Sequence, residues 1–458
     1  YQLTMAQGYW ANGKLDEEAC FHMFFRENPF KGGFAIACGA AQLAEMIDGF
    51  AFSDEDVAYL GSLQAPGGGP LFDEGFLAYL REMRLTLDVD AVREGTVVFP
   101  MEPIVRVTGP ILQCQLLETA LLCCMNFQTL IATKAARVCL AAQAPVAEFG
   151  LRRAQGAGGA LWASRAAVVG GCASTSNVLA GKMFDIPVSG THAHSWVMAF
   201  DSEIEAFRAY AKTFPKNCIL LVDTYDVKQG IEHAIEVGLE MRAQGESLDA
   251  AGLVDCGIVL SNDLDEYTIK SIRDQGADVM SWGVGTKLAC AYDQPSLGGV
   301  YKLSATRVAG CKAWSNRLKV SEQSSKLTLP GVLDVRRYSF ADGRIAGDMV
   351  FDVNEPVDGE GAIIDPADIL RQKKLAGYAF ETLLHPLARR GVSVLSDEER
   401  SALAARERTA AGISRLDESQ KRFLNPHSYP VGLEAGLWHR RASMAAALRE
   451  SGRADGLR

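Results

Sequence analysis

The segment Val146-Ala147-Glu148-Phe149-Gly150-Leu151-Arg152-Arg153 opens the part of the chain that decides the fold class. Short apolar strands alternate with helical segments from this point to about residue 285. The predicted strands are 146–150, 187–194, 218–223, 256–263 and 278–285, and the helices between them include 163–184, 203–214 and 229–242. This alternation is typical of parallel βα units.

Nearly every predicted strand ends in a group that can bind or react. In chain order these ends are 148–152, 191–195, Asp223 with Asp226, 261–263 and 283–286. Active sites of (β/α) barrels are built from the carboxyl ends of their strands. We therefore predict an α/β fold in which a (β/α) barrel carries the active site at this end.

The pattern changes on both sides of the barrel, to which we assign residues 113–312. Residues 1–112 mix short strands (21–25, 33–38, 96–99 and 103–108) with helical spacing at 40–47 and 71–84, which fits an α+β domain. Helical spacing from 111 to 143 predicts one long helix leading into the barrel. Residues 313–395 return to β character, with a hairpin turn at Asp342-Gly343. Residues 396–458 read as a helical extension, and the charged run at 396–420 as a solvated helix face.

The composition argues against several classes of protein. The chain has 458 residues, and 46 Lys and Arg against 56 Asp and Glu give a net charge of −10. It lacks the basic surplus that nucleic acid or an anionic membrane surface would require. No stretch approaches the roughly 18 apolar residues of a membrane span, and no targeting leader is visible. The 11 cysteines form no C-x-x-C pair, so we expect reduced core thiols in a soluble, cytoplasmic protein.

Two of the seven histidines lie together in Thr191-His192-Ala193-His194-Ser195. A single histidine at a strand end most often only hydrogen-bonds its neighbours. In a strand the two rings share a face and could bind a metal, but no third His or Cys ligand is near. A histidine beside serine and threonine at a barrel strand end suits a nucleophile or an acid–base group instead.

Acidic residues follow two other predicted strands, in Asp223-Thr224-Tyr225-Asp226 and Asn262-Asp263-Leu264-Asp265. Such residues could simply cap helices, but carboxylates converging on one barrel mouth suit sugar hydroxyls or Mg²⁺. Gly283-Val284-Gly285-Thr286 would let backbone N–H groups approach an anion, where barrels often bind phosphate.

Phe149 with Arg152 and Arg153 suits a flat, anionic ring, although a surface arginine pair is the simpler alternative. No Walker loop is present. The residues by themselves predict a barrel enzyme that acts on a phosphorylated, hydroxylated substrate together with an aromatic acid.

These stretches resemble the nicotinate phosphoribosyltransferase family. The resemblance covers, in family order, residues 1–6, 148–156, 175–181, 190–197, 222–226, 261–266, 283–286 and 295–302. It implies a type II phosphoribosyltransferase, with an irregular α/β barrel and a smaller α+β domain made from the N-terminal region and a later segment. Family enzymes join nicotinate to phosphoribosyl pyrophosphate, giving nicotinate mononucleotide and pyrophosphate in NAD biosynthesis and salvage, with Mg²⁺ and coupled ATP hydrolysis.

The resemblance also implies roles for particular residues. His194 matches the histidine that ATP phosphorylates, and Phe149 the aromatic that stacks on one face of the pyridine ring. Tyr1 matches a tyrosine that a partner subunit supplies to the other face, so we expect a homodimer with shared active sites.

The remaining matched residues surround the substrates. Arg152 falls at the nicotinate and phosphate site, and Asp223 and Asp263 fall near ribose and pyrophosphate. The 5′-phosphate loop matches Gly283, Gly285 and Thr286. Further substrate contacts are expected from Leu151, Ser176, Thr191, Ser195 and Asn262. Mg²⁺ is expected to arrive with the substrate pyrophosphate, and no set of protein ligands is assigned to it.

Ser176 bears on the choice of acceptor. Nicotinamide-using relatives look similar here but carry an aspartate at this position, whose carboxylate can accept from a carboxamide. A serine hydroxyl can instead donate to the carboxylate of nicotinate. The alternative is that Ser176 only caps a helix.

The sequence departs from the family pattern in two places. Family members carry Thr-Asp-Leu before the opening tyrosine, whereas this sequence begins at Tyr1. They also have a strand ending in Asp-Ser-Gly-Asp, and then a helix, where this sequence runs directly through 245–250. A barrel without that strand has two open edges, so we predict that a segment near Leu248 is missing from the sequence and present in the protein. A nicotinamide phosphoribosyltransferase and a non-catalytic, ligand-binding relative are the alternative interpretations.

Overall fold

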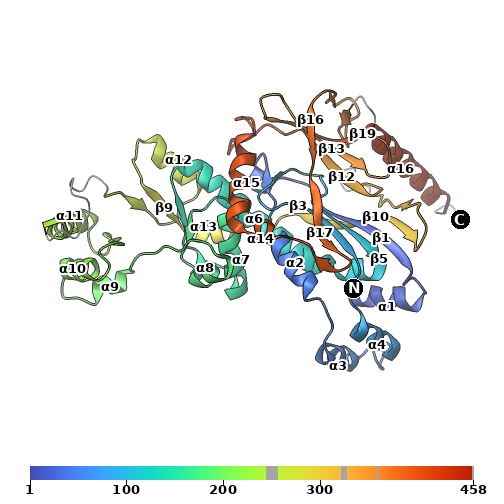
Figure 1. The fold of residues 1–458 in the computed structure, drawn as a ribbon, viewed down its shortest axis with the longest axis horizontal. Helices are drawn as coiled ribbons and strands as arrows, with labels where there is room; N and C mark the ends of the chain where they lie inside the picture. Colours follow the sequence, from blue (N-terminus) through green and yellow to red (C-terminus); the bar gives the residue numbers. More distant parts are fainter. Residues whose placement is uncertain (244–255, 321–326, 358–360, 456–458) are drawn as a thin grey trace.

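The structure is a computed structural model and describes residues 1–243, 256–320, 327–357 and 361–455. It contains a seven-stranded sheet, a six-stranded sheet, a four-stranded parallel sheet and a two-stranded ladder. Figure 1 shows the two larger sheets at the end of the molecule that carries both termini, with the parallel strands and a group of helices toward the opposite end.

The seven-stranded sheet joins the N-terminal region to later parts of the chain. Its order is β11-β10-β1-β5-β3-β17-β18, and every neighbouring pair is antiparallel. The strands are β1 (Glu17–Phe25), β3 (Asp88–Val92), β5 (Val105–Pro110), β10 (Gly299–Val308), β11 (Ser315–Asn316), β17 (Leu384–Arg389) and β18 (Val392–Ser393). The predicted α+β part made from the N-terminal region and a later segment is therefore confirmed, as are the strands at 21–25 and 103–108.

The six-stranded sheet is built from the last third of the chain, in the order β15-β14-β19-β13-β12-β16. Its strands are β12 (Leu333–Ser339), β13 (Ile345–Asp352), β14 (Ala362–Ile364), β15 (Gln372–Lys374), β16 (Ala379–Thr382) and β19 (Val431–Glu434). The hairpin turn predicted at Asp342-Gly343 joins β12 to β13, and Gly343 has the positive φ of 87° that favours glycine. β19 lies between β14 and β13, so the end of the chain completes this sheet.

Six α-helices lie within the first 142 residues. They are α1 (Gln2–Ala11), α2 (Ala40–Asp48), α3 (Asp54–Ser62), α4 (Glu74–Glu82), α5 (Ile111–Leu116) and α6 (Glu118–Ala142), with a short 3₁₀ turn η1 (Pro29–Lys31). The long helix predicted at 111–143 is α5 followed by α6, with Leu117 between them. The ladder of β2 (Ala35–Ile36) and β4 (Val97–Val98) confirms the strands predicted at 33–38 and 96–99.

The parallel sheet has the order β7-β6-β9-β8. Its strands are β6 (Val146–Glu148), β7 (Ser174–Thr175), β8 (Val259–Leu260) and β9 (Ser281–Val284), which confirms the strands predicted at 146–150, 256–263 and 278–285. The single helix predicted at 163–184 is wrong, because α7 (Gly156–Val169), β7 and α8 (Val178–Phe184) occupy this stretch. The chain turns at Gly170-Gly171: a Cβ at Gly170 would lie 2.2 Å from the carbonyl oxygen of Ala132, and Gly171 has φ +125°.

Two predicted strands are absent from the described residues. The stretch 187–194 makes one bridge, from Val188 to Thr175, because Pro187 has no N–H for a ladder, and its last residue, His194, already begins α9 (His194–Met198). The stretch 218–223 makes no ladder, although the hydroxyl of Thr191 donates to the carbonyl of Ile219 (2.9 Å). The helices predicted at 203–214 and 229–242 are confirmed as α10 (Glu203–Thr213) and α11 (Val227–Ala243).

The α9–α11 group has its own small apolar core, centred on Phe207, Val237 and Met241. The parallel sheet is followed by α12 (Glu266–Asp274) and α13 (Thr286–Ala289). Among the described residues the strands do not close into a ring, so closure of the barrel stays a prediction. The prediction about a missing segment near Leu248 lies outside the described residues.

The last helices are α14 (Asp397–Arg400), α15 (Ala402–Ser414) and α16 (Ala435–Asp455). The prediction that 396–420 is a solvated helix face is wrong for α15, which packs on α7 and buries Ala402, Ala405, Thr409 and Ile413. Small side chains at helical spacing let the two helices approach, and the hydroxyl of Thr409 donates to the carbonyl of Val169 (2.7 Å). Figure 1 shows α15 beside α7.

The cysteines are unpaired, and five of them are buried, whereas Cys123, Cys256 and Cys311 are exposed. The prediction of core thiols therefore holds for some of them and is wrong for those three. None of the helices formed by the described residues combines the length and the apolar character that crossing a membrane would require.

Candidate active site

The ends of β6, β9 and β8 come together at one edge of the parallel sheet. Glu148 at the end of β6 pairs with Val284 of β9, and Trp282 of β9 pairs with Leu260 of β8. The backbone N–H of Phe149 donates to the carbonyl of Val284 (2.8 Å). This register places the residues that follow the three strands next to one another.

Phe149 packs directly on Gly283. A Cβ at Gly283 would lie 2.8 Å from two ring carbons of Phe149 and 3.3 Å from the Cβ of Ser261. The glycine is therefore required by the close approach of the ring. Gly285 lies beside the backbone of Phe149, and Thr286 begins α13. The aromatic residue and the predicted phosphate loop thus share one surface.

Leu151 and Arg152 lie in the 3₁₀ turn η2 (Leu151–Arg153) that follows β6. Both side chains are exposed, so both are accessible to a ligand at this edge. The turn is fixed from behind by Glu148, whose buried carboxylate accepts from the N–H of Gly150 and from the hydroxyls of Ser164 (3.0 Å) and Thr175 (2.6 Å).

Ser176 lies in the turn between β7 and α8, and its N–H donates to the carbonyl of Glu148 (2.9 Å). The cap of α8 is the next residue, Asn177, whose side chain accepts from the N–H of Ala180 (3.2 Å). The alternative that Ser176 is merely a helix cap is therefore wrong. The side chain of Ser176 is half-buried. Ser176 follows Thr175, which pairs with Glu148, and Phe149 follows Glu148, so Ser176 and Phe149 leave neighbouring strands at the same end.

The turn after β8 has an unusual backbone. Asn262 and Asp263 have φ values of 92° and 44°, a region that non-glycine residues seldom occupy outside functional sites and tight turns. Both side chains are exposed. Asp265, two residues on, caps α12 by accepting from the N–H groups of Tyr267 (3.1 Å) and Thr268 (2.7 Å).

A salt bridge joins the β8 turn to the β9 turn: the Nζ of Lys287 in α13 lies 2.7 Å from the carboxylate of Asp265. Burial alone would raise the pKa of Asp265, but the bonds from Lys287 and from the N–H of Thr268 hold it below its usual value. The hydrogen bond to Asp265, with further attraction from Asp293 and Asp263, raises the pKa of Lys287. The interpretation of the sequence missed two residues, Lys287 and the buried Glu148. The position of Lys287 directly after Gly-Val-Gly-Thr was the signal that could have identified it.

The histidine segment forms a second group of predicted residues. The Nε2 of His192 accepts from the N–H of Leu221 (3.1 Å), and burial of the ring lowers the pKa of His192. The Nδ1 of His194 lies 3.2 Å from the hydroxyl of Thr224, and the side chain is exposed, as are Ser195 and Asp223. His192 is thus a neutral anchor within the fold, whereas His194 is accessible.

The two groups are linked through 187–189, where backbone bonds join Thr175 to Pro187 and Ser189 (both 3.0 Å). The structure does not bring Tyr1 to either group. Tyr1 is 71% exposed at the start of α1, which packs on α5. Figure 1 places the N-terminus at the other end of the molecule from β9.

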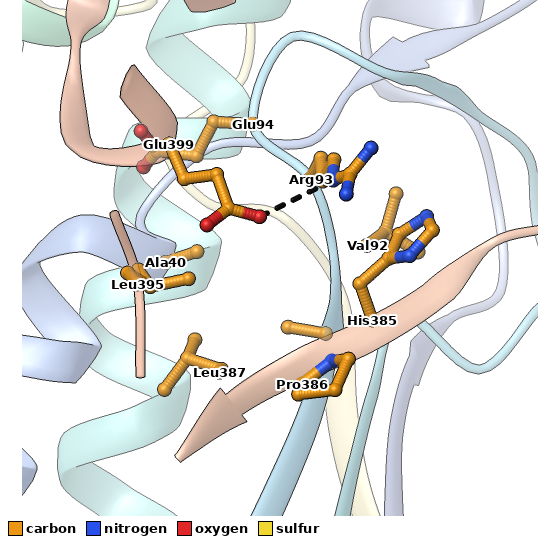
Figure 2. Close-up of a pocket in the computed structure, with 10 residues that line it drawn as sticks. Ala40, Val92, Arg93, Glu94, His385, Pro386, Leu387, Leu395 and Glu399 are labelled. Atoms are coloured by element: carbon orange, nitrogen blue, oxygen red, sulfur yellow. Dashed lines mark ion pairs between the residues drawn. The ribbon is translucent and has the colours of Figure 1, made fainter. Parts of the chain in front are cut away.

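Two cavities in the described part of the chain lie away from these strand ends. Figure 2 shows one of about 20 Å³, where Arg93 pairs with Glu399 (3.4 Å) beside His385. It has room for about one water molecule and cannot hold a pyridine ring. A more open hollow of about 350 Å³ lies along α6, lined by Thr119, Leu122, Cys123, Asn126, Phe127, Leu130, Pro295, Ser296 and Leu297.

Comparison with known proteins identifies the family. Residues 1–126 match the nicotinate phosphoribosyltransferase (NAPRTase) N-terminal domain, and 334–441 match the C-terminal domain of the same family. The nicotinate phosphoribosyltransferase of Bacillus subtilis is 38% identical over 96% of this chain and 92% of its own length. The human nicotinate phosphoribosyltransferase is 33% identical over 95% of this chain and 94% of its own length.

Solved structures agree in fold. The human nicotinic acid phosphoribosyltransferase has a TM-score of 0.80 at 30% identity, covering 97% of this chain and 99% of that chain. A nicotinate-nucleotide pyrophosphorylase from Pyrococcus furiosus shares the fold, with a TM-score of 0.64 at 20% identity over 90% of this chain and 93% of its own. The sequence relatives and the solved structures match nearly the full length of the chain. The chain therefore belongs to the nicotinate phosphoribosyltransferase family of enzymes.

Proposed function

We propose that this enzyme transfers the phosphoribosyl group of phosphoribosyl pyrophosphate to nicotinate. The bond from the ribose C1′ to the pyrophosphate oxygen breaks, pyrophosphate leaves with the electron pair, and the ring nitrogen of nicotinate forms the new bond to C1′. The observation that carries the proposal is the packing of Phe149 on Gly283, beside Arg152 and Ser176, because it presents an aromatic face, a cation and a hydroxyl at one edge.

The charges at the strand ends suit this reaction. An oxocarbenium-like ribose gains stability from nearby carboxylates, and Asp263 is exposed on the turn after β8. Asp223 is exposed in the histidine group, near Thr191 and Ser195, which we propose as further substrate contacts. Asn262 lies beside Asp263, and Leu151 beside Arg152. We propose Gly285 and Thr286, next to the backbone of Phe149, as the 5′-phosphate contacts.

We further propose that His194 takes the γ-phosphoryl group of ATP on a ring nitrogen, releasing ADP, and that water later releases phosphate. A neutral imidazole is a competent nucleophile, and the exposed ring of His194 is held through Nδ1 by Thr224. This step would couple ATP hydrolysis to the transfer. The anchoring of His192 in the fold supports the choice of His194.

Mg²⁺ is proposed to enter with the pyrophosphate. The described residues contain no cluster of three His, Cys, Asp or Glu side chains that could hold a metal ion. Mg²⁺ usually keeps several waters and binds through one or two carboxylates plus substrate phosphates, and we propose the exposed carboxylate of Asp223 or Asp263 as its protein ligand. The ion would neutralise the charge of the leaving pyrophosphate.

We also propose a homodimer in which Tyr1 of one subunit completes the site of the other. The support is that Tyr1 is exposed, and that Figure 1 places the N-terminus at the other end of the molecule from β9, the neighbour of β6. We also propose that the enzyme acts in NAD biosynthesis and is located in the cytoplasm.

The test is formation of nicotinate mononucleotide from nicotinate and phosphoribosyl pyrophosphate, measured with and without ATP, with nicotinamide as a second acceptor. The proposal predicts turnover of nicotinate that ATP stimulates. Preferred turnover of nicotinamide would indicate the alternative acceptor, and binding of substrates without turnover would indicate a non-catalytic relative.

A further inference from the structure

Behind Phe149 and Ser176 lies a closed ring of four buried polar side chains. Its members are Glu148, Thr175, Asn177 and Ser164, and each is 4% exposed or less. They belong to different elements: Glu148 ends β6, Thr175 ends β7, Asn177 caps α8 and Ser164 lies within α7. The ring therefore joins four segments at the edge that carries the proposed acceptor site.

The hydrogen bonds of the ring run from Asn177 to the Glu148 carboxylate along two routes, one through Thr175 and one through Ser164. The hydroxyl of Thr175 donates to the Glu148 carboxylate (2.6 Å) and accepts from the N–H of Asn177 (3.0 Å). The side-chain amide of Asn177 donates to the hydroxyl of Ser164 (3.2 Å), whose one hydrogen has two acceptors at 3.0 Å, the Glu148 carboxylate and the carbonyl of Ala160. Each hydroxyl thus bridges the carboxylate and the asparagine, so displacing one member leaves others unsatisfied.

The residues next to the ring in sequence are the proposed acceptor contacts. Phe149 follows Glu148, and Ser176 lies between Thr175 and Asn177. The Glu148 carboxylate also accepts from the N–H of Gly150, and the Glu148 carbonyl accepts from the N–H of Ser176 (2.9 Å). Both acceptor contacts are therefore fixed to a common buried group.

Ala160 and Ala163 of α7 and Val146 of β6, which are close in sequence to Ser164 and Glu148, are buried apolar residues. Apolar residues of similar volume would fill this space without the cost of burying a carboxylate. We infer that this polar ring is retained for the positions it fixes and not for stability.

We propose that Glu148 is a positioning residue that, through the ring, sets the distance between Phe149 and Ser176 and so the affinity for the acceptor. This inference rests on the proposed function. Glu148 itself does not reach the ligand, because it is 1% exposed and its carboxylate is directed to α7 and β7.

The experiment compares Thr175→Val, which removes one donor to Glu148 at similar volume, with Thr175→Ser, which keeps it, and with Glu148→Gln. The matched control is Thr409→Val. Thr409 is also buried and also donates one bond toward α7, to the Val169 carbonyl, but it lies on α15. Steady-state kinetics with both substrates is measured for each variant, together with amide hydrogen exchange by mass spectrometry.

We expect Thr175→Val and Glu148→Gln to raise KM for nicotinate roughly tenfold, the effect of losing one buried hydrogen bond. KM for phosphoribosyl pyrophosphate should stay unchanged. Thr175→Ser, which keeps the hydroxyl, should have the wild-type KM for nicotinate. Thr409→Val should lower the melting temperature and leave both KM values unchanged. Equal kinetics in Thr175→Val and Thr409→Val, or an equal rise in both KM values, would overturn the proposal.

Hydrogen exchange separates this proposal from the proposed function. We expect faster exchange in both 149–153 and 174–178 for Thr175→Val and Glu148→Gln, but not for Thr409→Val. If the wild-type protein has no transferase activity but this exchange pattern is found, the proposed function fails and the positioning role stands. Exchange in the two segments that matches the Thr409→Val control would overturn the positioning role whatever the activity.

Discussion

The Nε2 atom of His192 accepts a hydrogen bond from the backbone N–H of Leu221 at 3.1 Å, whereas His194, two residues on, is bonded only through Nδ1 to Thr224 among the described residues. The first bond needs a neutral ring, and burial lowers the pKa of His192 accordingly. Two histidines that look equivalent in the sequence therefore have different surroundings, and we propose different roles for them.

Substitution of the two histidines should separate these roles. We expect His194→Asn to abolish phosphorylation of the protein by labelled ATP and to remove ATP stimulation of turnover. His192→Asn should keep the labelling and instead lower the melting temperature, because the Leu221 N–H loses its partner, a loss of about 1–3 kcal/mol. Undiminished labelling of the His194→Asn protein would contradict the assignment.

Gly283→Ala should displace the Phe149 ring. The added Cβ would lie 2.8 Å from two ring carbons, and overpacking of this kind typically costs about 1–3 kcal/mol. We expect KM for nicotinate to rise roughly tenfold as the ring moves. The control is Gly298→Ala, where an added Cβ meets nothing within 4 Å. Equal KM values for the two variants would show that the Phe149 ring does not contact nicotinate.

Ser176→Asp should disfavour nicotinate. The aspartate would face the carboxylate of the acceptor, and the charge-assisted bond from the serine hydroxyl, worth about 1.5–3 kcal/mol, would be lost. We expect kcat/KM for nicotinate to fall roughly ten- to a hundredfold, with turnover of nicotinamide unchanged or raised. If nicotinate kinetics stayed at the wild-type level, the choice of acceptor would rest on Arg152.

The shared site can be tested by complementation. Tyr1→Ala and Phe149→Ala should each be inactive as homodimers, because each removes one face of the ring-binding pair. Heterodimers of the two variants contain one site with both wild-type residues. In randomly mixed subunits we expect about a quarter of the wild-type activity, as two-fold symmetry requires. No recovery of activity on mixing would show that Tyr1 and Phe149 act in the same chain or not at all.

Glu102 makes the stability of the fold dependent on pH. Burial raises the pKa of Glu102 well above its usual value, the charge of Asp348 and its hydrogen bond raise it further, and Arg337 opposes both. The folded protein therefore holds a proton that the unfolded chain, with a Glu pKa near 4.3, releases. Because the pKa of Glu102 is higher in the folded protein, its contribution to the free energy of unfolding is full below about pH 4.3. Above that pH the free energy of unfolding falls by about 1.4 kcal/mol per pH unit, until the pH reaches the pKa of the folded protein.

Glu102→Gln should remove this dependence. We expect its melting temperature to exceed that of the wild type at pH 8 and the difference to vanish toward pH 4. The control is the exposed Glu407→Gln, for which the difference should stay near zero. A pH profile for Glu102→Gln parallel to that of the wild type would show that Glu102 is ionised in the folded protein.

Local patterns in the sequence predicted many of the elements correctly. The helices α10 and α11 and the strands β1, β5, β6 and β9 follow from apolar spacing, and the β12–β13 turn follows from Asp342-Gly343. These features depend on neighbours a few residues apart, so periodicity and turn chemistry suffice to predict them. The family match likewise needed only short stretches in the right order.

Other features were decided by contacts between distant residues. The helix expected at 163–184 is divided because Gly170 packs against Ala132 of α6, and the solvated face expected on α15 is buried because it meets α7. Phe149 and Gly283 are 134 positions apart, and neither shows by its type that it packs on the other.

The same holds for the candidate site. The sequence by itself determined which residue types follow the strands, because each strand and its end are continuous in the chain. Only the tertiary structure decided that the Glu148 carboxylate meets Ser164, Thr175 and the Gly150 N–H, and that Asn177, not Ser176, caps α8. The physical reason is that a buried polar group must find its partners wherever the packing of elements brings them, and that packing depends on the whole chain at once.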